Sequence, residues 1–229
     1  MDEPRRPVIV LISANAEWQG VLQAVPGVEC QPSPFGDWFS NSIANIPLIF
    51  LHGGLGKIAA AASTTYAIER WKPELVANLG TCGGFTGKAE RGQVLLVDET
   101  IVYDIIEQMG DPAAALEHYS SRLDLGWLPA ALLPGIQRSR LVSADRDILP
   151  QDIPMLVERF GAVAADWESG AIAWVAQKYG VRCLILRAVS DLVGAEGGEV
   201  YDDLGEFQVR AMELMGVLIG DLEEILANL

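Results

Sequence analysis

Basic side chains are few in this chain. Its 229 residues include 16 lysines and arginines against 31 aspartates and glutamates, a formal net charge of −15. Nucleic acids and anionic lipid surfaces attract positive charge, so this balance argues against both as partners. No stretch approaches the roughly 20 consecutive apolar residues that a membrane-spanning helix needs. The acidity also disfavours a polyanionic substrate, but not a neutral one.

Histidine and cysteine are also scarce. The two histidines, His52 and His118, make a zinc site built on imidazoles unexpected. Three cysteines, Cys30, Cys82 and Cys183, show no metal-ligand spacing, and their odd number indicates a reducing compartment. The first seven residues, MDEPRRP, lack the apolar run of a signal peptide. These absences predict a cytoplasmic protein without a metal or a cofactor.

Apolar residues make up 50% of the chain, enough for one large core, and we expect a single domain over residues 1–229. Strand-like and helix-like segments alternate, which predicts an α/β fold with a mostly parallel central sheet flanked by helices. The predicted strands are 8–12, 46–51, 75–79, 94–97, 141–144, 162–165 and 182–189. The predicted helices are one ending at 25 and others at 58–71, 112–119, 154–160, 169–179 and 207–226. Segments 26–46 and 104–139 show turn signals or mixed patterns, and the second is a candidate specificity loop.

Carboxylates follow several of these predicted strands. Asp166 and Glu168 come after strand 162–165, and Asp191 closes strand 182–189. Ligands of open α/β sheets bind beyond the carboxyl ends of the strands, so these acids are expected to meet in one cleft. The alternative is that Asp166 or Glu168 only caps helix 169–179.

Glu17 and two glycine-rich turns lie at comparable places. Glu17 follows strand 8–12, where it is either a site residue or an acid that interacts with a helix dipole. The turn His52 to Lys57 precedes a helix, but Ile58 follows the lysine, so this is not a P-loop. A phosphate cradle and a plain tight turn both remain open there. In the second turn, residues 80–84, Cys82 has no evident histidine base, which favours packing over nucleophilic catalysis.

Three motifs carry a resemblance to a known family. ADWESGAIA (residues 165–173) followed by RAVSD (187–191) resembles the VEMEATAIA and RAISD motifs of the nucleoside phosphorylase/nucleosidase superfamily. GTCGG (80–84) resembles the GSAGG or GSCGG motif of that family. The most similar branch is the 5′-methylthioadenosine/S-adenosylhomocysteine nucleosidases. The resemblance implies one domain with a mixed, mostly parallel central sheet, commonly in a homodimer, and a β-meander at 26–46.

The same resemblance implies roles for site residues. Asp191 is the acid that faces the purine ring nitrogen, Glu17 positions the attacking water, and Glu168 binds the ribose hydroxyls. Burial, together with the charges of Glu17 and Glu168, is expected to raise the pKa of Asp191. The remaining predicted substrate contacts are Thr81, Gly83, Asp147, Trp167 and Ser190.

The chain also departs from the relatives. Asp147 stands where they have an aromatic residue that stacks on the base, and Trp167 stands where a methionine packs the sugar. Asp166 replaces a usual glutamate. A carboxylate cannot stack on a purine, so Trp167 or Trp18 is expected to compensate.

The resemblance and the acids that carry it imply an enzyme that hydrolyses the N-glycosidic bond of a purine nucleoside such as 5′-methylthioadenosine or S-adenosylhomocysteine. A phosphorylase is less favoured because segments 8–25 and 51–69 contain no arginine to bind phosphate. Futalosine hydrolase remains an alternative because of Asp147. A nucleoside-binding or storage protein is a further alternative, although binding alone needs no acid–base pair. Segment 194–203 is interpreted as either a mobile lid or a solvated loop.

Overall fold

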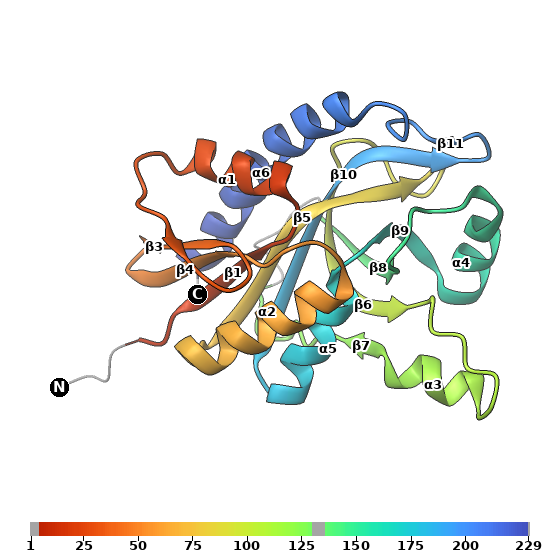
Figure 1. Ribbon diagram of the computed structural model, residues 1–229, viewed down its shortest axis with the longest axis horizontal. Helices are drawn as coiled ribbons and strands as arrows, with labels where there is room; N and C mark the ends of the chain where they lie inside the picture. The colour runs from red at the N-terminus through yellow and green to blue at the C-terminus, as the bar shows by residue number, and fades with distance from the viewer. Residues whose placement is uncertain (1–4, 130–135, 229) are drawn as a thin grey trace.

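The computed structural model describes residues 5–129 and 136–228, so part of the predicted loop 104–139 and the first four residues lie outside it (Figure 1). The strands are β1 Val8–Ile12, β2 Gln31–Pro32, β3 Asp37–Ile43, β4 Ile46–His52, β5 Leu75–Phe85, β6 Val94–Val102, β7 Ser120–Arg122, β8 Gln137–Ser143, β9 Ala162–Asp166, β10 Arg182–Gly194 and β11 Gly197–Gly198. The helices are α1 Asn15–Ala24, α2 Gly56–Trp71, α3 Pro112–His118, α4 Ile153–Phe160, α5 Ser169–Tyr179 and α6 Leu204–Ala227.

All of these strands belong to one mixed sheet. Strands β4, β1, β5 and β10 pair in parallel, as do β6, β8 and β9. Antiparallel pairs join β10 to β6 and β9 back to β5, so five strands close a circuit. The closing contact pairs Gly83 and Gly84 with Ala165 and Ala164, where small residues let the backbones approach. The predicted α/β class with a mixed central sheet is confirmed.

Helices cover both faces of the sheet. In β1, Val8, Val10 and Ile12 pack with α1 and α6, whereas Ile9 and Leu11 pack with α2 and α5. Side chains alternate between the faces of a strand, so a strand that is apolar throughout is buried on both sides. Figure 1 shows α1 and α6 on one side of the sheet and α2 and α5 on the other. No helix in the described ranges has the length and apolar character needed to cross a membrane.

Several predicted strands are longer in the structure. β5 continues through the glycine-rich segment 80–84 to Phe85, because β10 pairs with it along its whole length. β10 likewise continues to Gly194, so the prediction that Asp191 ends the strand is wrong. A bulge between Val189 and Asp191 shifts the register there. Segment 26–46, which shows only turn signals, contains β3, which pairs with β4 in the expected meander.

Candidate active site

The pocket lies at the carboxyl ends of β1, β5, β9 and β10 and encloses about 550 Å³. That size suits a small ligand of nucleoside dimensions. Its lining includes all eight predicted site residues: Glu17, Thr81, Gly83, Asp147, Trp167, Glu168, Ser190 and Asp191. Five elements or their following loops supply them, so the expected meeting of acids from separate strands takes place.

Glu17 is a buried carboxylate held by three donors. Its Oε1 accepts hydrogen bonds from the backbone N–H of Thr81 at 2.6 Å and from Thr81 Oγ1 at 2.9 Å. Its Oε2 accepts from the backbone N–H of Ala14 at 3.1 Å, the contact expected of a first-turn acid. Because it also bonds β5 and lines the pocket, Glu17 does more than start a helix.

Glu168 lines the same pocket and bonds the start of α2. Its Oε1 accepts from the backbone N–H of Gly56 at 2.8 Å. Gly56 has a φ of 85°, so glycine is required where the turn presents this N–H at the start of α2. The turn at 52–57 thus holds a carboxylate of the protein itself. Burial, with the charge of Asp166, raises the pKa of Glu168 to about 8.

Asp191 lies in the strand bulge, where it is 4% exposed. Ser190 Oγ donates a hydrogen bond to Asp191 Oδ1 at 2.7 Å. Burial raises the pKa of Asp191, and the Ser190 hydrogen bond opposes this effect. The charge that raises the pKa further is that of Glu199, rather than those of Glu17 and Glu168 as expected. A carboxyl that favours its neutral form is suited to donating a proton.

Asp166 joins the pocket lining to the start of α5 and to Arg187. Its carboxylate accepts from the backbone N–H of Ser169 at 3.1 Å, which caps α5, and from Ser143 Oγ at 2.6 Å. It also forms an ion pair of 2.7 Å with Arg187 Nη2. The capping alternative therefore describes Asp166, whereas Glu168 makes no such hydrogen bond to α5.

Arg187 is a functional neighbour that the sequence analysis missed. It is fully buried and bonds Asn78 Oδ1 and Ser169 Oγ as well as Asp166. A Cβ atom on Gly80 would lie 1.8 Å from Arg187 Nη1 and 2.8 Å from Glu17 Oε1, so this glycine leaves room for both groups. The detectable signal was an arginine inside a buried strand, since such a charge needs a partner.

The aromatic lining also differs from expectation. Trp167 lines the pocket, but Trp18 does not belong to the lining and stacks on His52 with 5.5 Å between ring centroids. Tyr201 and Phe207 contribute further rings that the sequence analysis did not single out. They follow Asp191 within the segment suspected of forming a lid and the start of α6.

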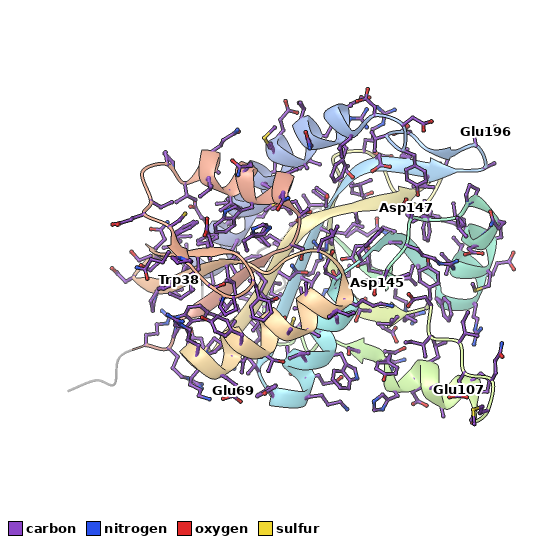
Figure 2. The ribbon with its side chains drawn as sticks, in the orientation of Figure 1. Trp38, Glu69, Glu107, Asp145, Asp147 and Glu196 are labelled. Atoms are coloured by element: carbon purple, nitrogen blue, oxygen red, sulfur yellow. The ribbon has the colours of Figure 1, made fainter. Side chains whose placement is uncertain are left out.

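Polar groups stand at the entrance. Asp147 is exposed at the pocket edge, and Figure 2 shows it near the ends of β5 and β10. Arg146 also lines the pocket but is paired with Asp152 at 2.6 Å.

Cys82 lines the pocket from a buried position, and burial raises the pKa of its thiol. A thiol that resists ionisation is a poor nucleophile, which supports the packing role.

Comparisons with known proteins agree with this fold. A sequence model of the phosphorylase superfamily matches residues 9–226. The 5′-methylthioadenosine/S-adenosylhomocysteine nucleosidase of Marinomonas sp. (strain MWYL1) is 28% identical over 222 residues, which cover 91% of this chain and 96% of that protein.

Two solved structures share the fold. The 5′-methylthioadenosine/S-adenosylhomocysteine nucleosidase of Campylobacter jejuni has a TM-score of 0.81 at 16% identity and covers 98% of this chain and 100% of its own. The futalosine hydrolase of Helicobacter pylori strain 26695 has a TM-score of 0.80 at 19% identity, with 98% of both chains covered. At such identities the likeness concerns the fold alone. Since the family match spans almost the whole described chain, the protein belongs to the phosphorylase superfamily.

Proposed function

We propose that this protein is a cytoplasmic hydrolase that cleaves the N-glycosidic bond of a purine nucleoside such as 5′-methylthioadenosine or S-adenosylhomocysteine. The observation that carries the proposal is the convergence of Glu17 from α1, Glu168 from the loop after β9 and Asp191 from β10 on one pocket. The name of the Marinomonas relative, which aligns along most of the chain, supports the same activity.

Each acid has a distinct role in the proposed reaction. Asp191 donates its proton to the purine, which accepts the electron pair of the breaking carbon–nitrogen bond. The sugar acquires oxocarbenium character, as in other glycoside hydrolyses. Glu17 orients a water molecule toward the anomeric carbon and takes its proton as the new carbon–oxygen bond forms. Glu168 accepts hydrogen bonds from the ribose hydroxyls through its carboxyl oxygens.

Hydrolysis is favoured over phosphorolysis by the charges around Glu17. A carboxylate in the pocket repels phosphate. The nearby Arg187 is neutralised by Asp166 and fully buried, and Arg146 is paired with Asp152. Arg187 is buried outside the pocket lining, and the ion pair of Arg146 with Asp152 competes with an incoming phosphate.

Base release is therefore expected in phosphate-free buffer at the same rate as in buffer with phosphate. The measurement is free purine released from 5′-methylthioadenosine, followed by chromatography together with the sugar product. If base release requires phosphate and the sugar product is the 1-phosphate of 5-methylthioribose, the protein is a phosphorylase.

Two alternatives are distinguished by a panel of nucleosides. The first alternative is futalosine hydrolysis, which Asp147 at the pocket edge leaves open. The futalosine hydrolase of Helicobacter pylori shares the fold of this protein. Adenosine, inosine, 5′-methylthioadenosine, S-adenosylhomocysteine and futalosine are each assayed for base release and for binding by calorimetry. Binding without release of any base would identify a nucleoside-binding or storage protein.

A homodimer is expected from apolar side chains exposed at the start of α2 and in the segment before α3. Leu55, Ile58, Ile106 and Met109 are 61%, 86%, 79% and 99% exposed. Lys57, which pairs with Asp104, brings their two segments together. Exposed apolar surface of this kind is typical of an interface.

Light scattering is expected to give about twice the 24.7 kDa of one chain. Ile58→Glu should shift the mass toward the monomer. Val217→Glu, at a 49% exposed position on α6 across the sheet, should not. A wild-type mass near that of one chain would contradict the homodimer.

A further inference from the structure

The segment after Asp191 turns back onto the strand that carries it. Gly197 and Gly198 of β11 pair with Gly194 and Val193 of β10. Val200 and Tyr201 then line the pocket, and Tyr201 Oη donates a hydrogen bond to the Ile148 carbonyl at 2.9 Å. Val200 and Tyr201 therefore form part of the pocket wall. Their attachment to β10 determines where this wall stands relative to Asp191.

Glu199 makes the closest attachment. Its backbone N–H donates to the Leu192 carbonyl at 3.1 Å, and its Oε2 accepts from the Leu192 N–H at 3.0 Å. Both backbone polar groups of the residue directly after Asp191 are thus bound by one glutamate. A carboxylate that accepts from a backbone N–H forms a charge-assisted hydrogen bond, stronger than a neutral one.

Two arginines extend this attachment. Arg91 Nη2 donates to Glu199 Oε1 at 2.9 Å. Arg210 of α6 lies 3.8 Å from Glu199 Oε2 and donates to the Ser190 carbonyl at 3.1 Å. Ser190 and Leu192, the two neighbours of Asp191 in the chain, are therefore held by linked groups. The register shift falls at Ser190, between Val189 and Asp191, so Asp191 lies directly after the bulge and between these two anchors.

We propose that Glu199 is a positioning residue, which fixes the strand bulge beside Asp191 through Leu192 and joins it to the pocket wall formed by Val200 and Tyr201. This role rests on the proposed function, in which Asp191 is the acid. A displacement of about 1 Å at a reacting group can cost roughly 100-fold in rate, so a contact one residue away is well placed to affect catalysis.

The charge of Glu199 acts in the same direction. Burial raises the pKa of Asp191, the Ser190 hydrogen bond lowers it, and the nearby Glu199 carboxylate raises it again. The guanidinium groups of Arg210 and Arg91 act in the opposite sense. Since both arginines pair with Glu199, the same glutamate offsets part of their effect on the acid.

The test compares Glu199→Ala, Glu199→Gln and, as a matched control, Glu196→Ala. Glu196 is an exposed acid of the same segment, and Figure 2 shows it at the tip of the turn, away from the body. Cleavage of 5′-methylthioadenosine is measured in steady state. Amide hydrogen exchange of residues 190–193 and 198–201 is measured on the ligand-free protein.

Glu199→Ala is expected to lower kcat/KM and to accelerate the exchange, each by roughly ten-fold, the scale of a lost hydrogen bond to a charged group. Glutamine keeps an oxygen for the Leu192 N–H but loses the negative charge, and with it the ion pairs and the effect of that charge on the pKa of Asp191. Glu199→Gln should therefore stay within roughly five-fold of the wild type, the scale of an exposed ion pair. Glu196→Ala should match the wild type.

Three results would overturn the proposal: Glu199→Ala matching Glu196→Ala, faster exchange with unchanged kcat/KM, or equal losses in the alanine and glutamine variants. If the wild-type protein releases no base from 5′-methylthioadenosine or from the other nucleosides, the proposed function fails first. The exchange measurement then still decides separately whether Glu199 holds the bulge.

Discussion

Replacing Asp191 with asparagine is expected to lower kcat by roughly 10²–10⁴-fold, the usual contribution of general acid–base catalysis. Asparagine has nearly the same shape and can still accept from Ser190 Oγ, which lies 2.7 Å from Oδ1. It has no proton to give to the departing purine. The base must then leave as an anion, which raises the barrier to bond cleavage.

The stability of the Asp191→Asn variant, unlike its kcat, is not expected to fall. Burial raises the pKa of Asp191, so the folded protein favours the neutral carboxyl. The stability associated with that neutral form is present below the ordinary pKa of an aspartate and is lost as the pH rises through the raised pKa. Asparagine does not ionise, so it removes the free-energy cost of burying a charged carboxylate. Near neutral pH the variant should therefore melt no lower than the wild type.

Activity and melting are therefore measured on the same preparations, from pH 5 to pH 9. The wild-type kcat should fall on the alkaline side as Asp191 loses its proton, and the asparagine variant should lack this limb. A structural Asp191 predicts the reverse pattern, with a lower Tm and an activity loss that follows unfolding. An unchanged kcat would remove Asp191 from the mechanism.

Glu17→Gln is expected to bind ligand almost normally but to turn over at least about 100-fold more slowly. The glutamate uses Oε1 for Thr81 and Oε2 for Ala14. A glutamine has only one oxygen, and its amide nitrogen would face a backbone N–H on one side. The variant therefore loses both the proton acceptor for water and one hydrogen bond of the folded protein.

Glu168→Ala provides the contrast. A group that holds the ribose acts in the ground state and in the transition state, so its removal should raise KM as well as lower kcat. Isothermal titration with adenine and with a nucleoside analogue separates binding from turnover for both variants. If Glu17→Gln keeps the wild-type rate and loses only about 0.5–2 kcal/mol of stability, Glu17 is just a helix-start acid.

Local patterns in the sequence were sufficient for the architecture. Apolar runs such as Val8–Ile12 and helical spacing such as Ser169–Tyr179 correspond to the observed elements, because burial requires those periods. The same patterns placed Glu17, Glu168 and Asp191 beside strand ends. Glu17 follows β1 and Asp191 lies in β10, and both strands are parallel to β5, so their common pocket was predictable from strand direction. Glu168 follows β9, which is antiparallel to β5, so strand direction did not predict its place in the same pocket.

Strand ends and strand pairings were harder to predict from the sequence. The continuation of β5 and β10 through Gly80–Gly84 and Asp191 depends on long-range pairing, and no local propensity reports it. Strand β3 was likewise hidden, because one of its faces is largely exposed and its composition resembles a turn. A partner strand far along the chain supplies the hydrogen bonds that define each of these segments.

The sequence by itself determined the α/β class, the family and the acids that gather at the pocket. Only the tertiary structure decided which contacts each acid makes. Asp166 forms an ion pair with Arg187, Glu168 accepts a hydrogen bond from the Gly56 N–H, and Glu199 accepts one from the Leu192 N–H. These partners lie between 7 and 112 positions apart in the chain. The charge, burial and hydrogen bonding of a carboxyl depend on distances in space, and those exist only once the chain has folded.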